Sequence, residues 1–457
     1  MTWDETIALL HGTDWKSVKA GLNRISELLH LLDDPHKKLR FVHIAGTNGK
    51  GSAAAMLAEI LTEAGYRTGR YISPHLVRMN ERFCVNGEPI RDADLRETAS
   101  IVRAAAEQMI DKPTNFELLT ALSFVYFLRQ HCDIVVLEVG LGGRLDATNV
   151  IDHSLVSLIM HIGLEHTAEL GDTVEQIAYE KAGIIKQGGD VVLYAQMPEV
   201  EGVVSRIAAE REARLTVTDQ SRLDVLDRGD PESATPFSPD QPDPDDQAVG
   251  NERFSGQIFT YRSREELHLS LLGRHQTNNA AVVLDAVDIL RERHGYEISE
   301  AVIRKALSTV NWPGRFQVLS RDPLLVVDGA HNPNGMQALA ESIRLYFAGR
   351  RMIFLMGVMA DKNYRRMLDI LAEECGDIEV IRFIAEAPHE ERALRPEQLK
   401  TEISRRFRCP VDSCDSVREG IKLALKTAAE AATDRPVILA FGSLYQVGEI
   451  LAIYESM

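Results

Sequence analysis

The chain has 457 residues, of which 45% are hydrophobic and 26% are charged, so it can bury an ordinary globular core and is long enough for two or three domains. Its formal net charge of −17 disfavours nucleic acid and anionic membrane surfaces as partners, because both repel an acidic protein. The N-terminal residues lack the basic and apolar segments of a signal peptide, and no apolar run is long enough to span a bilayer. The five scattered cysteines form no disulfide pattern, so we expect reduced thiols and a cytoplasmic protein.

Apolar strands alternate with helices over the first part of the chain. A helix at 52–64 is rich in alanine and leucine and ends before Gly65, a residue type that commonly terminates helices. The alternation predicts an α/β fold whose mainly parallel sheet is covered by helices on both faces. The strands predicted for this sheet are Phe41–Ala45, 70–72, 134–139, 155–160 and 191–194.

Residues 223–252 differ in composition from the rest of the chain, since they are rich in proline, aspartate and serine and hold few large apolar residues. Such a segment buries too little apolar surface to offset the entropy that it would lose on ordering. It therefore predicts a long mobile insertion inside the first domain, with a solvated loop favoured over a regulatory one. A helix is predicted after it, at 276–291.

A second α/β domain is predicted beyond the turn at 311–317, whose Pro-Gly pair suits a linker. The alternation of strands and helices begins again there and indicates a Rossmann-like C-terminal domain. We therefore expect an N-terminal domain at 1–311, a linker at 312–316 and a C-terminal domain at 317–457. The strands predicted in the second domain are 324–327, Met352–Met356, 380–384 and Val437–Phe441.

A glycine-rich loop lies between the first predicted strand and its helix. Glycines let the backbone turn and bring N–H groups together, and the helix start adds the positive end of its dipole, so the loop predicts ATP binding by the N-terminal domain. Lys50 supplies a point charge for the terminal phosphates, and the Ser52 hydroxyl is placed to reach Mg²⁺. The spacing departs from the generic phosphate loop, because Ile44 replaces the first glycine and Gly51 separates Lys50 from Ser52. The loop residues predicted to bind ATP are Gly46, Thr47, Asn48, Gly49, Lys50, Gly51 and Ser52.

The run VHIAGTNGKGS, which contains this loop, resembles the phosphate loop of folylpolyglutamate synthases and, more distantly, that of the Mur ligases. The resemblance continues in order through most of the chain but leaves out the acidic insertion. It implies a Mur ligase-like P-loop domain followed by a Rossmann-like domain, and the ATP-dependent joining of L-glutamate to folates and to dihydropteroate. The other matching blocks are SPHLVRMNERFCVNGEPI (73–90), EVGLGGRLDATNVI (138–151), GLEHTAELGDTVEQIAYEKAGIIK (163–186), GRHQTNNAA (273–281), WPGRFQ (312–317), DGAHNP (328–333) and FGSLYQVGEI (441–450).

A first magnesium site is predicted near the phosphate loop. Glu138 closes the predicted strand at 134–139, and a carboxylate at the carboxyl end of a parallel strand is well placed to bind Mg²⁺. The alternative is a structural ion pair between Glu138 and Arg144. Ser73 alone suggests a plain turn serine, but the resemblance implies that it also coordinates magnesium.

The resemblance implies a second metal site. It assigns His166 to this metal, although a lone histidine is more often a structural residue. It also assigns Lys181, in the form of a carbamate made with CO₂; the local sequence alone suggests a surface lysine paired with Glu180 or Glu175. Glu165 stands where the family has an aspartate.

Nucleotide and glutamate contacts are expected from the second domain. Asp328 ends a predicted strand, and glycine and His331 follow, a pattern typical of a ligand crevice; a helix cap is the local alternative for Asp328. The resemblance implies that Asp328 and Arg315 contact ATP and that His331 lies near the glutamate or the acyl phosphate. It also implies that Asn279 contacts the nucleotide. Two further residues, for which capping and packing are the local alternatives, would line the cleft between the domains: Ser443 and Tyr445.

A pocket for the pterin side of the substrate is expected near residue 115. The spacing of Thr114 and Glu117 predicts a capped helix start, and the resemblance places the pocket there. The Phe116 ring suits stacking on a flat heterocycle. Arg82 is a candidate for contact with an anionic substrate, with a surface arginine as the alternative. The resemblance assigns to the pocket Thr114, Asn115, Phe116, Glu117, Leu145, Asp146 and Ala147.

The expected reaction begins with attack of the substrate carboxylate on the γ-phosphate of ATP, and the amine of glutamate then displaces phosphate. ATP and Mg²⁺ at two sites are the expected cofactors, with a monovalent cation as a further candidate, and the chain is expected to act as a monomer.

Two other functions are alternatives to a folate ligase. They are another ligase of the Mur or cyanophycin-synthetase type and a nucleotide-dependent switch without ligase activity. The candidate catalytic residues are Lys50, Glu138, His166, Lys181 and His331.

Overall fold

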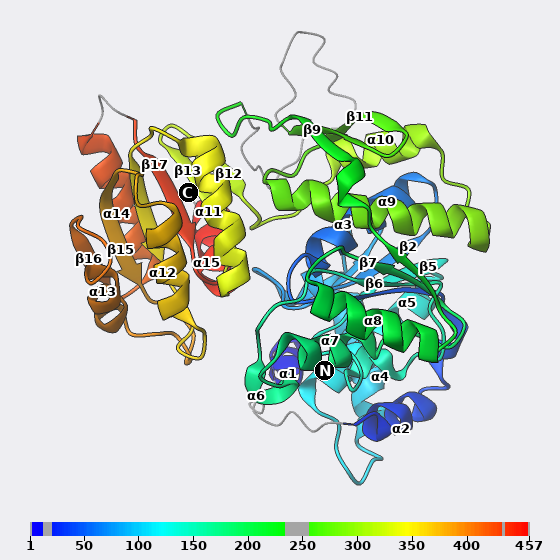
Figure 1. Ribbon diagram of the computed structural model, residues 1–457. Coiled ribbons are helices and arrows are strands. Elements are labelled where there is room, and N and C mark those ends of the chain that lie inside the picture. The colour runs from blue at the N-terminus through cyan, green and yellow to red at the C-terminus, as the bar shows by residue number, and fades with distance from the viewer. Residues whose placement is uncertain (1, 12–20, 234–255, 432–434, 456–457) are drawn as a thin grey trace. The chain divides into compact units, whose positions relative to one another are not determined.

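Figure 1 shows the computed structural model of the chain, which describes residues 2–11, 21–233, 256–431 and 435–455. Contacts within it define two compact units. The N-terminal unit comprises Met1–Leu223 and Asn278–Val310, and the C-terminal unit comprises Asp224–Thr277 and Asn311–Met457. The domain limits expected from the sequence stay a prediction, because compactness alone does not define a functional domain. Among the described residues, no helix is long and apolar enough to cross a membrane.

An eight-stranded sheet forms the centre of the N-terminal unit, in the order β4-β3-β2-β5-β1-β6-β7-β8. Its strands are parallel except at one edge, where β3 pairs antiparallel with both β2 and β4. Every residue of β1, β5, β6 and β7 is buried, which is why these strands stand out in the sequence as apolar runs. The strands are β1 (Phe41–Ala45), β2 (Thr68–Tyr71), β3 (Phe83–Val85), β4 (Glu88–Pro89), β5 (Ile134–Glu138), β6 (Val156–Ile159), β7 (Asp190–Leu193) and β8 (Arg214–Val217).

Helices pack on this sheet in separate groups. The helices α4 and α5 share a buried cluster with β5, and Phe124 and Leu137 both belong to it. The helix α3, which begins directly after the phosphate loop, packs against β1, β2 and β5, and α7 and α8 share a cluster with β7. The helices are α1 (Trp3–His11), α2 (Asn23–Leu31), α3 (Lys50–Glu63), α4 (Asp92–Ala106), α5 (Asn115–Arg129), α6 (Thr167–Leu170), α7 (Val174–Ala182), α8 (Pro198–Glu210), α9 (Arg274–His294) and α10 (Glu300–Thr309), with short 3-10 turns at Pro35–Lys38, Met79–Arg82, Ala147–Val150 and Gln220–Arg222.

The strand β1 lies inside the sheet, with parallel neighbours on both sides. The chain leaves β1 through α3 toward β2 on one side, and it later adds β6 on the other side. The carboxyl end of such a strand is the place where open α/β sheets bind ligands. The phosphate loop follows β1 at this place, as the sequence predicted.

A six-stranded sheet, in the order β12-β13-β17-β14-β15-β16, forms the centre of the C-terminal unit. Its strands are parallel except for β12, which pairs antiparallel with β13. A separate three-stranded sheet has the order β11-β10-β9. The strands are β9 (Leu223–Asp227), β10 (Gln257–Tyr261), β11 (Arg264–Leu269), β12 (Gln317–Arg321), β13 (Leu324–Asp328), β14 (Met352–Met356), β15 (Val380–Glu386), β16 (Val411–Cys414) and β17 (Val437–Phe441).

The larger sheet of the C-terminal unit lies between two groups of helices (Figure 1). Met352, Phe354 and Met356 of β14 share one buried cluster with α11, α12 and α13. The residues between them, Ile353 and Leu355, are fully buried as well and point to the opposite face, because side chains alternate along a strand; α14 packs against β14 there. The helices are α11 (Pro333–Phe347), α12 (Tyr364–Glu374), α13 (Pro396–Ser404), α14 (Val417–Glu430) and α15 (Leu444–Glu455).

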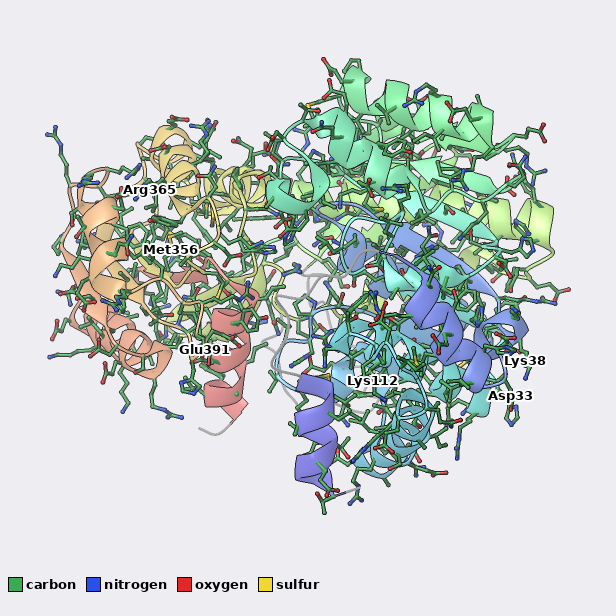
Figure 2. The ribbon with its side chains drawn as sticks, turned by 90° about the horizontal axis from the view of Figure 1, so that it is seen from below. Asp33, Lys38, Lys112, Met356, Arg365 and Glu391 are labelled. Atoms are coloured by element: carbon green, nitrogen blue, oxygen red, sulfur yellow. The ribbon has the colours of Figure 1, made fainter. Side chains whose placement is uncertain are left out.

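Charged side chains lie mostly on the outside of the units. Among the residues labelled in Figure 2, Met356 is buried, whereas Asp33, Lys38, Lys112 and Glu391 are exposed. Buried charged groups are the exceptions, and they point to functional sites because their burial is costly unless they are paired. Those that bear on the site are Glu138, Asp146, Lys181, Asp328 and Glu386.

The structure corrects one part of the predicted insertion. Residues Leu223–Asp227 form the strand β9 and not the loop expected from residue 223. Leu223 and Val225 are half-buried and alternate with exposed residues, a pattern of period two that the acidic composition concealed. The insertion expected at 234–252 lies outside the described residues. The strands β8 and β16 were also missed, because RLTV and VDSC mix polar and apolar residues.

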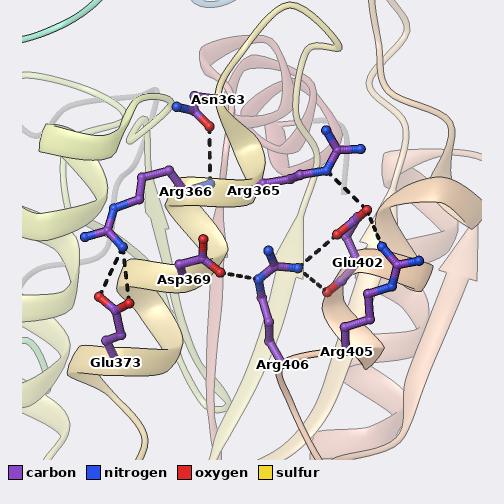
Figure 3. Close-up of polar contacts among 8 residues, drawn as sticks. All are labelled: Asn363, Arg365, Arg366, Asp369, Glu373, Glu402, Arg405 and Arg406. Carbon is purple, nitrogen blue, oxygen red and sulfur yellow. Dashed lines mark hydrogen bonds and ion pairs between the residues drawn. The ribbon is translucent and has the colours of Figure 1, made fainter.

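Three arginines surround the carboxylate of Glu402 (Figure 3). Their hydrogen bonds to this carboxylate join α12 to α13. Arg365 Nε and Arg405 Nη1 donate to Oε1 at 3.2 and 2.8 Å, and Arg406 Nη1 donates to Oε2 at 2.9 Å. Arg406 Nε also donates to Asp369 Oδ1 at 2.6 Å. The hydrogen bond from Arg406 and the neighbouring guanidinium charges lower the pKa of Glu402.

Replacing Glu402 by glutamine should lower the free energy of unfolding at neutral pH by about 1 kcal/mol, a modest value because Arg365 and Arg405 are more than half exposed and water screens them. Since the folded state lowers the pKa, this stabilisation is present above the ordinary value of 4.5 and disappears as the pH falls below it. Urea unfolding of wild type and Glu402→Gln across this range tests it, with the exposed Glu391→Gln as control. A difference that does not depend on pH would contradict the electrostatic explanation.

Candidate functional site

The phosphate loop needs glycine at two positions. Gly46 has φ +154° and Gly49 has φ +87°, conformations that side chains rarely adopt. A Cβ atom on Gly46 would lie 2.6 Å from Met160 Cβ, and one on Gly49 would lie 2.6 Å from Asn279 Oδ1. The structure therefore brings Asn279, which the sequence analysis assigned to the nucleotide, against the loop.

Part of the loop is tied to the end of β6. The Thr47 and Asn48 N–H groups donate to His161 O at 2.8 and 3.2 Å, and the Thr47 hydroxyl exchanges hydrogen bonds with the backbone of Gly163. These two N–H groups thus hold the loop in shape. The N–H groups of the first turn of α3 are the better candidates for binding phosphate, because a helix start offers them no carbonyl partner within the helix.

Lys50 and Glu138 come together at the carboxyl ends of β1 and β5. Lys50 Nζ lies 4.0 Å from Glu138 Oε1 and donates to Gly46 O and Thr47 O at 3.1 and 3.3 Å. Glu138 is 4% exposed, and its Oε2 accepts a hydrogen bond from Ser73 N at 3.2 Å. The predicted magnesium residues Glu138 and Ser73 are therefore neighbours of the loop that carries Ser52, which is also buried.

Arg144 pairs with Glu180 and not with Glu138. Its Nε and Nη2 donate to Glu180 Oε1 at 3.1 and 2.9 Å, and its guanidinium lies 5.6 Å from the centre of the Tyr179 ring. The alternative of a structural Glu138–Arg144 pair is therefore wrong. Glu180 is not the observed partner of Lys181 either, because Lys181 Nζ donates to Gly46 O.

Lys181 is buried, which contradicts the alternative of a surface lysine. It is 6% exposed, and its Nζ donates to Gly46 O at 2.9 Å. Burial, with a smaller effect from the charge of Lys50, lowers its pKa to about 7, while Glu165 and Asp146 oppose the shift. The amine of Lys181 is therefore largely neutral slightly above neutral pH, the form that can react as a nucleophile.

His166 directly precedes the short helix α6 and has φ +52°. Its Nε2 lies 4.0 Å from Glu165 Oε1, and its side chain is 42% exposed. Glu165 is one of the charges that act on Lys181. Glu165 therefore lies near His166 and also acts on Lys181 through its charge. Metal binding by His166 and Lys181 stays a prediction.

The capped start of α5 is confirmed. Thr114 Oγ1 accepts from Glu117 N, and the Glu117 carboxylate accepts from Thr114 N at 2.6 Å. That carboxylate is also held by Arg24, whose Nη2 lies 3.1 Å from Oε1. Asn115 Nδ2 donates to Leu9 O and Leu10 O at 3.3 and 2.6 Å. Asn115 and Glu117 therefore support the start of α5, and their contact with substrate stays a prediction.

The ring of Phe116 covers Gly140. A Cβ atom on Gly140 would lie 2.3 Å from Phe116 Cζ, so the backbone of the loop after β5 passes directly beside the ring. Leu145 on the same loop is 37% exposed, whereas Ala147 and Asp146 are buried. This arrangement suits a pocket with one flat apolar wall.

Arg82 donates from Nε to His75 Nδ1 at 2.9 Å. His75 follows Ser73, so this hydrogen bond links Arg82 to the segment that carries a predicted magnesium residue. The contact of Arg82 with substrate stays a prediction.

In the C-terminal unit, Asp328 shapes the loop that follows β13. Its Oδ2 accepts from Phe316 N and its Oδ1 from Ala330 N, both at 2.8 Å. The guanidinium of Arg315 lies over Gly329, because a Cβ atom there would meet Nη1 at 2.0 Å. His331 Nδ1 lies 2.7 Å from Gly329 O. The structure thus brings Arg315, Asp328 and His331 together, and their contacts with ATP or glutamate stay predictions.

Ser443 and Tyr445 lie at the end of β17 and the start of α15. Ser443 is 2% exposed, and its Oγ accepts from Tyr445 N at 3.1 Å. Gln446 next to them donates to Glu386 Oε1 at 2.6 Å. The local alternative of a capping serine is therefore observed, and a role in binding stays a prediction.

Glu386, which the sequence analysis did not single out, ends β15 with no exposed surface. A Cβ atom on Gly420 would lie 1.8 Å from its Oε2, so α14 needs a glycine beside the carboxyl group. Burial raises the pKa of Glu386 to about 8 despite the hydrogen bond from Gln446. The group is therefore largely uncharged at neutral pH.

Two families of known proteins match the chain. Residues 44–287 match the Mur ligase middle domain, and residues 314–444 match the glutamate ligase domain of Mur ligases. The dihydrofolate synthase/folylpolyglutamate synthase of Bacillus subtilis is 36% identical over 370 residues, which cover 79% of this chain and 80% of that protein. The folylpolyglutamate synthase of Lacticaseibacillus casei is 32% identical over 97% of both chains.

Solved structures are similar over almost the whole chain. The folylpolyglutamate synthase of Mycobacterium tuberculosis, complexed with ADP and AMPPCP, has a TM-score of 0.83 and 30% identity and covers 98% of this chain and 99% of its own. The Escherichia coli FolC in complex with DHPP and ADP has a TM-score of 0.81 and 27% identity and covers 100% of this chain and 98% of its own.

Replacing Glu386 by glutamine should stabilise the protein at alkaline pH. Because the folded state raises the pKa from 4.5 to about 8, wild-type stability falls as the pH rises between these values, whereas glutamine does not ionise. The gain should be small at about pH 5 and of the order of 3 kcal/mol at about pH 8. Urea unfolding across this range measures it, with Glu391→Gln as control. Equal pH dependence in wild type and Glu386→Gln would contradict the prediction.

Proposed function

The chain belongs to the folylpolyglutamate synthase/dihydrofolate synthase family of the Mur ligases, and we propose that it joins L-glutamate to a folate at the expense of ATP. The observation that carries the proposal is the meeting of Lys50 with the buried Glu138 at the start of α3. This places a cation, a carboxylate and helix N–H groups at one point, as phosphoryl transfer requires. Tetrahydrofolates and dihydropteroate are the proposed acceptors.

The carboxylate of the acceptor attacks the γ-phosphate of ATP, because a free carboxylate is too stable to form an amide in water. An acyl phosphate forms and ADP leaves. Lys50 and the first-turn N–H groups of α3 oppose the negative charge on the transferring group. The amine of glutamate then attacks the acyl carbon, the amide bond forms, and phosphate leaves.

The residues present fit Mg²⁺, which prefers oxygen ligands. Glu138 is a buried carboxylate that accepts from Ser73 N and lies 4.0 Å from Lys50 Nζ, and Ser52 and Ser73 each carry a hydroxyl group. When bound, the ion neutralises phosphate charge. A second ion would be held by Glu138, His166 and Lys181.

Lys181 fits the second ion only after modification, because an ammonium group repels a cation. Its neutral amine can attack CO₂, so that a C–N bond forms and a proton leaves to solvent; the carbamate then offers two oxygen atoms. Burial and the lowered pKa of Lys181 support this proposal, since burial favours the neutral amine that the reaction needs.

The C-terminal unit supplies the remaining proposed contacts. Arg315 and Asp328 are assigned to ATP, and His331, Ser443 and Tyr445 are assigned to the glutamate side. The close grouping of Arg315, Gly329 and His331 supports the assignment. All five cysteines are free, which agrees with a proposed location in the reducing cytoplasm. A monomer is proposed as the active form.

Replacing Lys50 by methionine should lower kcat for amide synthesis by about a hundredfold or more, because it removes the cation of the phosphate site. Phosphate release is measured with glutamate and either dihydropteroate or tetrahydrofolate, and a muramyl nucleotide serves as the competing acceptor. The exposed Lys38→Met is the matched control and should keep the wild-type rate. An unchanged rate in Lys50→Met would overturn the site, and ATP hydrolysis that needs neither glutamate nor folate would overturn the ligase.

Carbamylation of Lys181 should make activity depend on CO₂. Activity should fall in buffer stripped of CO₂ and return when bicarbonate is added, because the modification is reversible. With ¹³C-labelled bicarbonate, NMR should show one carbamate carbon in wild type and none in Lys181→Met. Lys186→Met is the control for a second buried lysine and should keep the signal. Full activity of wild type without CO₂ would contradict the proposal.

A further inference from the structure

A buried hydrogen-bonded chain runs from the middle of β1 to the loop after β5. We propose that His43 and Thr148 are positioning residues that hold the carboxylate of Asp146 in one orientation for the substrate. The inference deepens the proposed function and rests on it, because Asp146 is assigned to the folate pocket. Neither His43 nor Thr148 was singled out in the sequence.

Hydrogen bonds of definite direction make up the chain. Thr148 Oγ1 donates to Asp146 Oδ1 at 2.5 Å, and Thr148 N donates to the same oxygen at 3.0 Å. Since the hydroxyl has one hydrogen and gives it to Asp146, it must accept from His43 Nε2, which lies 2.9 Å away. His43 therefore carries its proton on Nε2. The imidazole fixes the hydroxyl, and the hydroxyl in turn fixes the carboxylate.

The surroundings of His43 keep its ring neutral. The side chain has no exposed surface, and Nδ1 has no hydrogen-bond partner among the described residues. A proton on Nδ1 would bury a second N–H group without an acceptor, which is costly. Burial and the charge of Lys186 lower the pKa of His43 well below its ordinary value. The donor role of Nε2 therefore does not change across the neutral pH range.

The carboxylate of Asp146 depends on these donors. Burial raises its pKa, and hydrogen bonds from the backbone of Leu141 and Gly140 and from Thr148 oppose the rise. The negative charge of Asp146 acts on two titratable groups, Lys181 of α7 and Tyr71 of β2, and raises the pKa of each. Loss of the Thr148 hydroxyl would leave Asp146 with less support for its negative charge.

The same carboxylate lies close to the Phe116 ring, which we assign to the folate pocket. Leu141 N donates to Asp146 Oδ2 at 2.9 Å, and Gly140, the preceding residue, is covered by the Phe116 ring. The Gly140 backbone also acts on the carboxylate as a hydrogen-bond donor, and Gly140 lies directly under the Phe116 ring. An N–H donor of a heterocycle stacked on Phe116 would therefore approach Asp146 beside Gly140 and share the carboxylate with that backbone group. An orientation fixed in advance would lower the cost of binding such a donor.

The test separates the hydroxyl from the shape of residue 148. Thr148→Val removes the donor and keeps the shape, and it should raise KM for the folate about tenfold while KM for ATP stays within about twofold. As the pH falls, KM for the folate should rise in both proteins. The rise should start at a higher pH in Thr148→Val than in wild type, because Asp146 protonates more easily without the hydroxyl. Thr148→Ser keeps the hydroxyl and should restore the wild-type values.

A double-mutant cycle tests whether His43 acts through Thr148. His43→Leu should raise KM for the folate in the wild-type background but add little in Thr148→Val, since the intermediate hydroxyl is then absent. Three results would overturn the positioning role. They are additive effects in the cycle, an unchanged KM for the folate in Thr148→Val, and parallel increases of the KM values for folate and ATP with a lower Tm.

Binding of dihydropteroate to wild type is measured separately by calorimetry. If wild type neither binds nor uses a folate, the proposed function fails; if it does both and Thr148→Val matches it, only this inference fails.

Discussion

The structure around the phosphate loop depends on one interaction, which holds a lysine and a carboxylate together largely away from water. The protein around this pair has a net charge of −17. Lys50 and Glu138 are 4.0 Å apart, a distance at which their attraction is strong only because little solvent screens it. The pair exists because β1 and β5 are parallel neighbours that end at the same edge of the sheet. The backbone of Gly46 and Gly49 then lets the loop pass close to Met160 and Asn279. A shift of either strand would separate the charges.

The sequence predicted the central strands and the phosphate loop because their signals are local. The strands β1, β5, β14 and β17 are short apolar runs buried on both faces, and the start of α5 is marked by a capping box four residues long. The strand β9 was not predicted, because its alternation of half-buried and exposed residues is weak and the sequence that follows it is acidic. The pairing of Arg144 with Glu180 spans 36 residues, and no local pattern reveals which acid a distant arginine will meet.

The residues assigned to the proposed pterin pocket differ in what their side chains contact. Phe116 covers Gly140 and is the residue proposed to form a flat wall. Asn115 and Glu117 instead bond to the end of α1 and to Arg24, so their polar groups fix where α5 begins and hence where the Phe116 ring lies. A family resemblance groups such residues together because they are neighbours in sequence. Only the hydrogen bonds show that their tasks differ, and Arg24 emerges only from the folded structure.

The loop that carries Asp146 and the phosphate loop share one support. His43 lies two positions before the end of β1, whose next residues form the phosphate loop, and it reaches Asp146 through Thr148. On the other side, Lys186 donates to Asn149 Oδ1 at 2.8 Å and follows the helix that carries Lys181. The loop that holds Asp146 is thus fixed by the same strand and the same helical segment that position Lys50 and Lys181. Because packed elements transmit small displacements, a displacement of β1 would disturb both loops together.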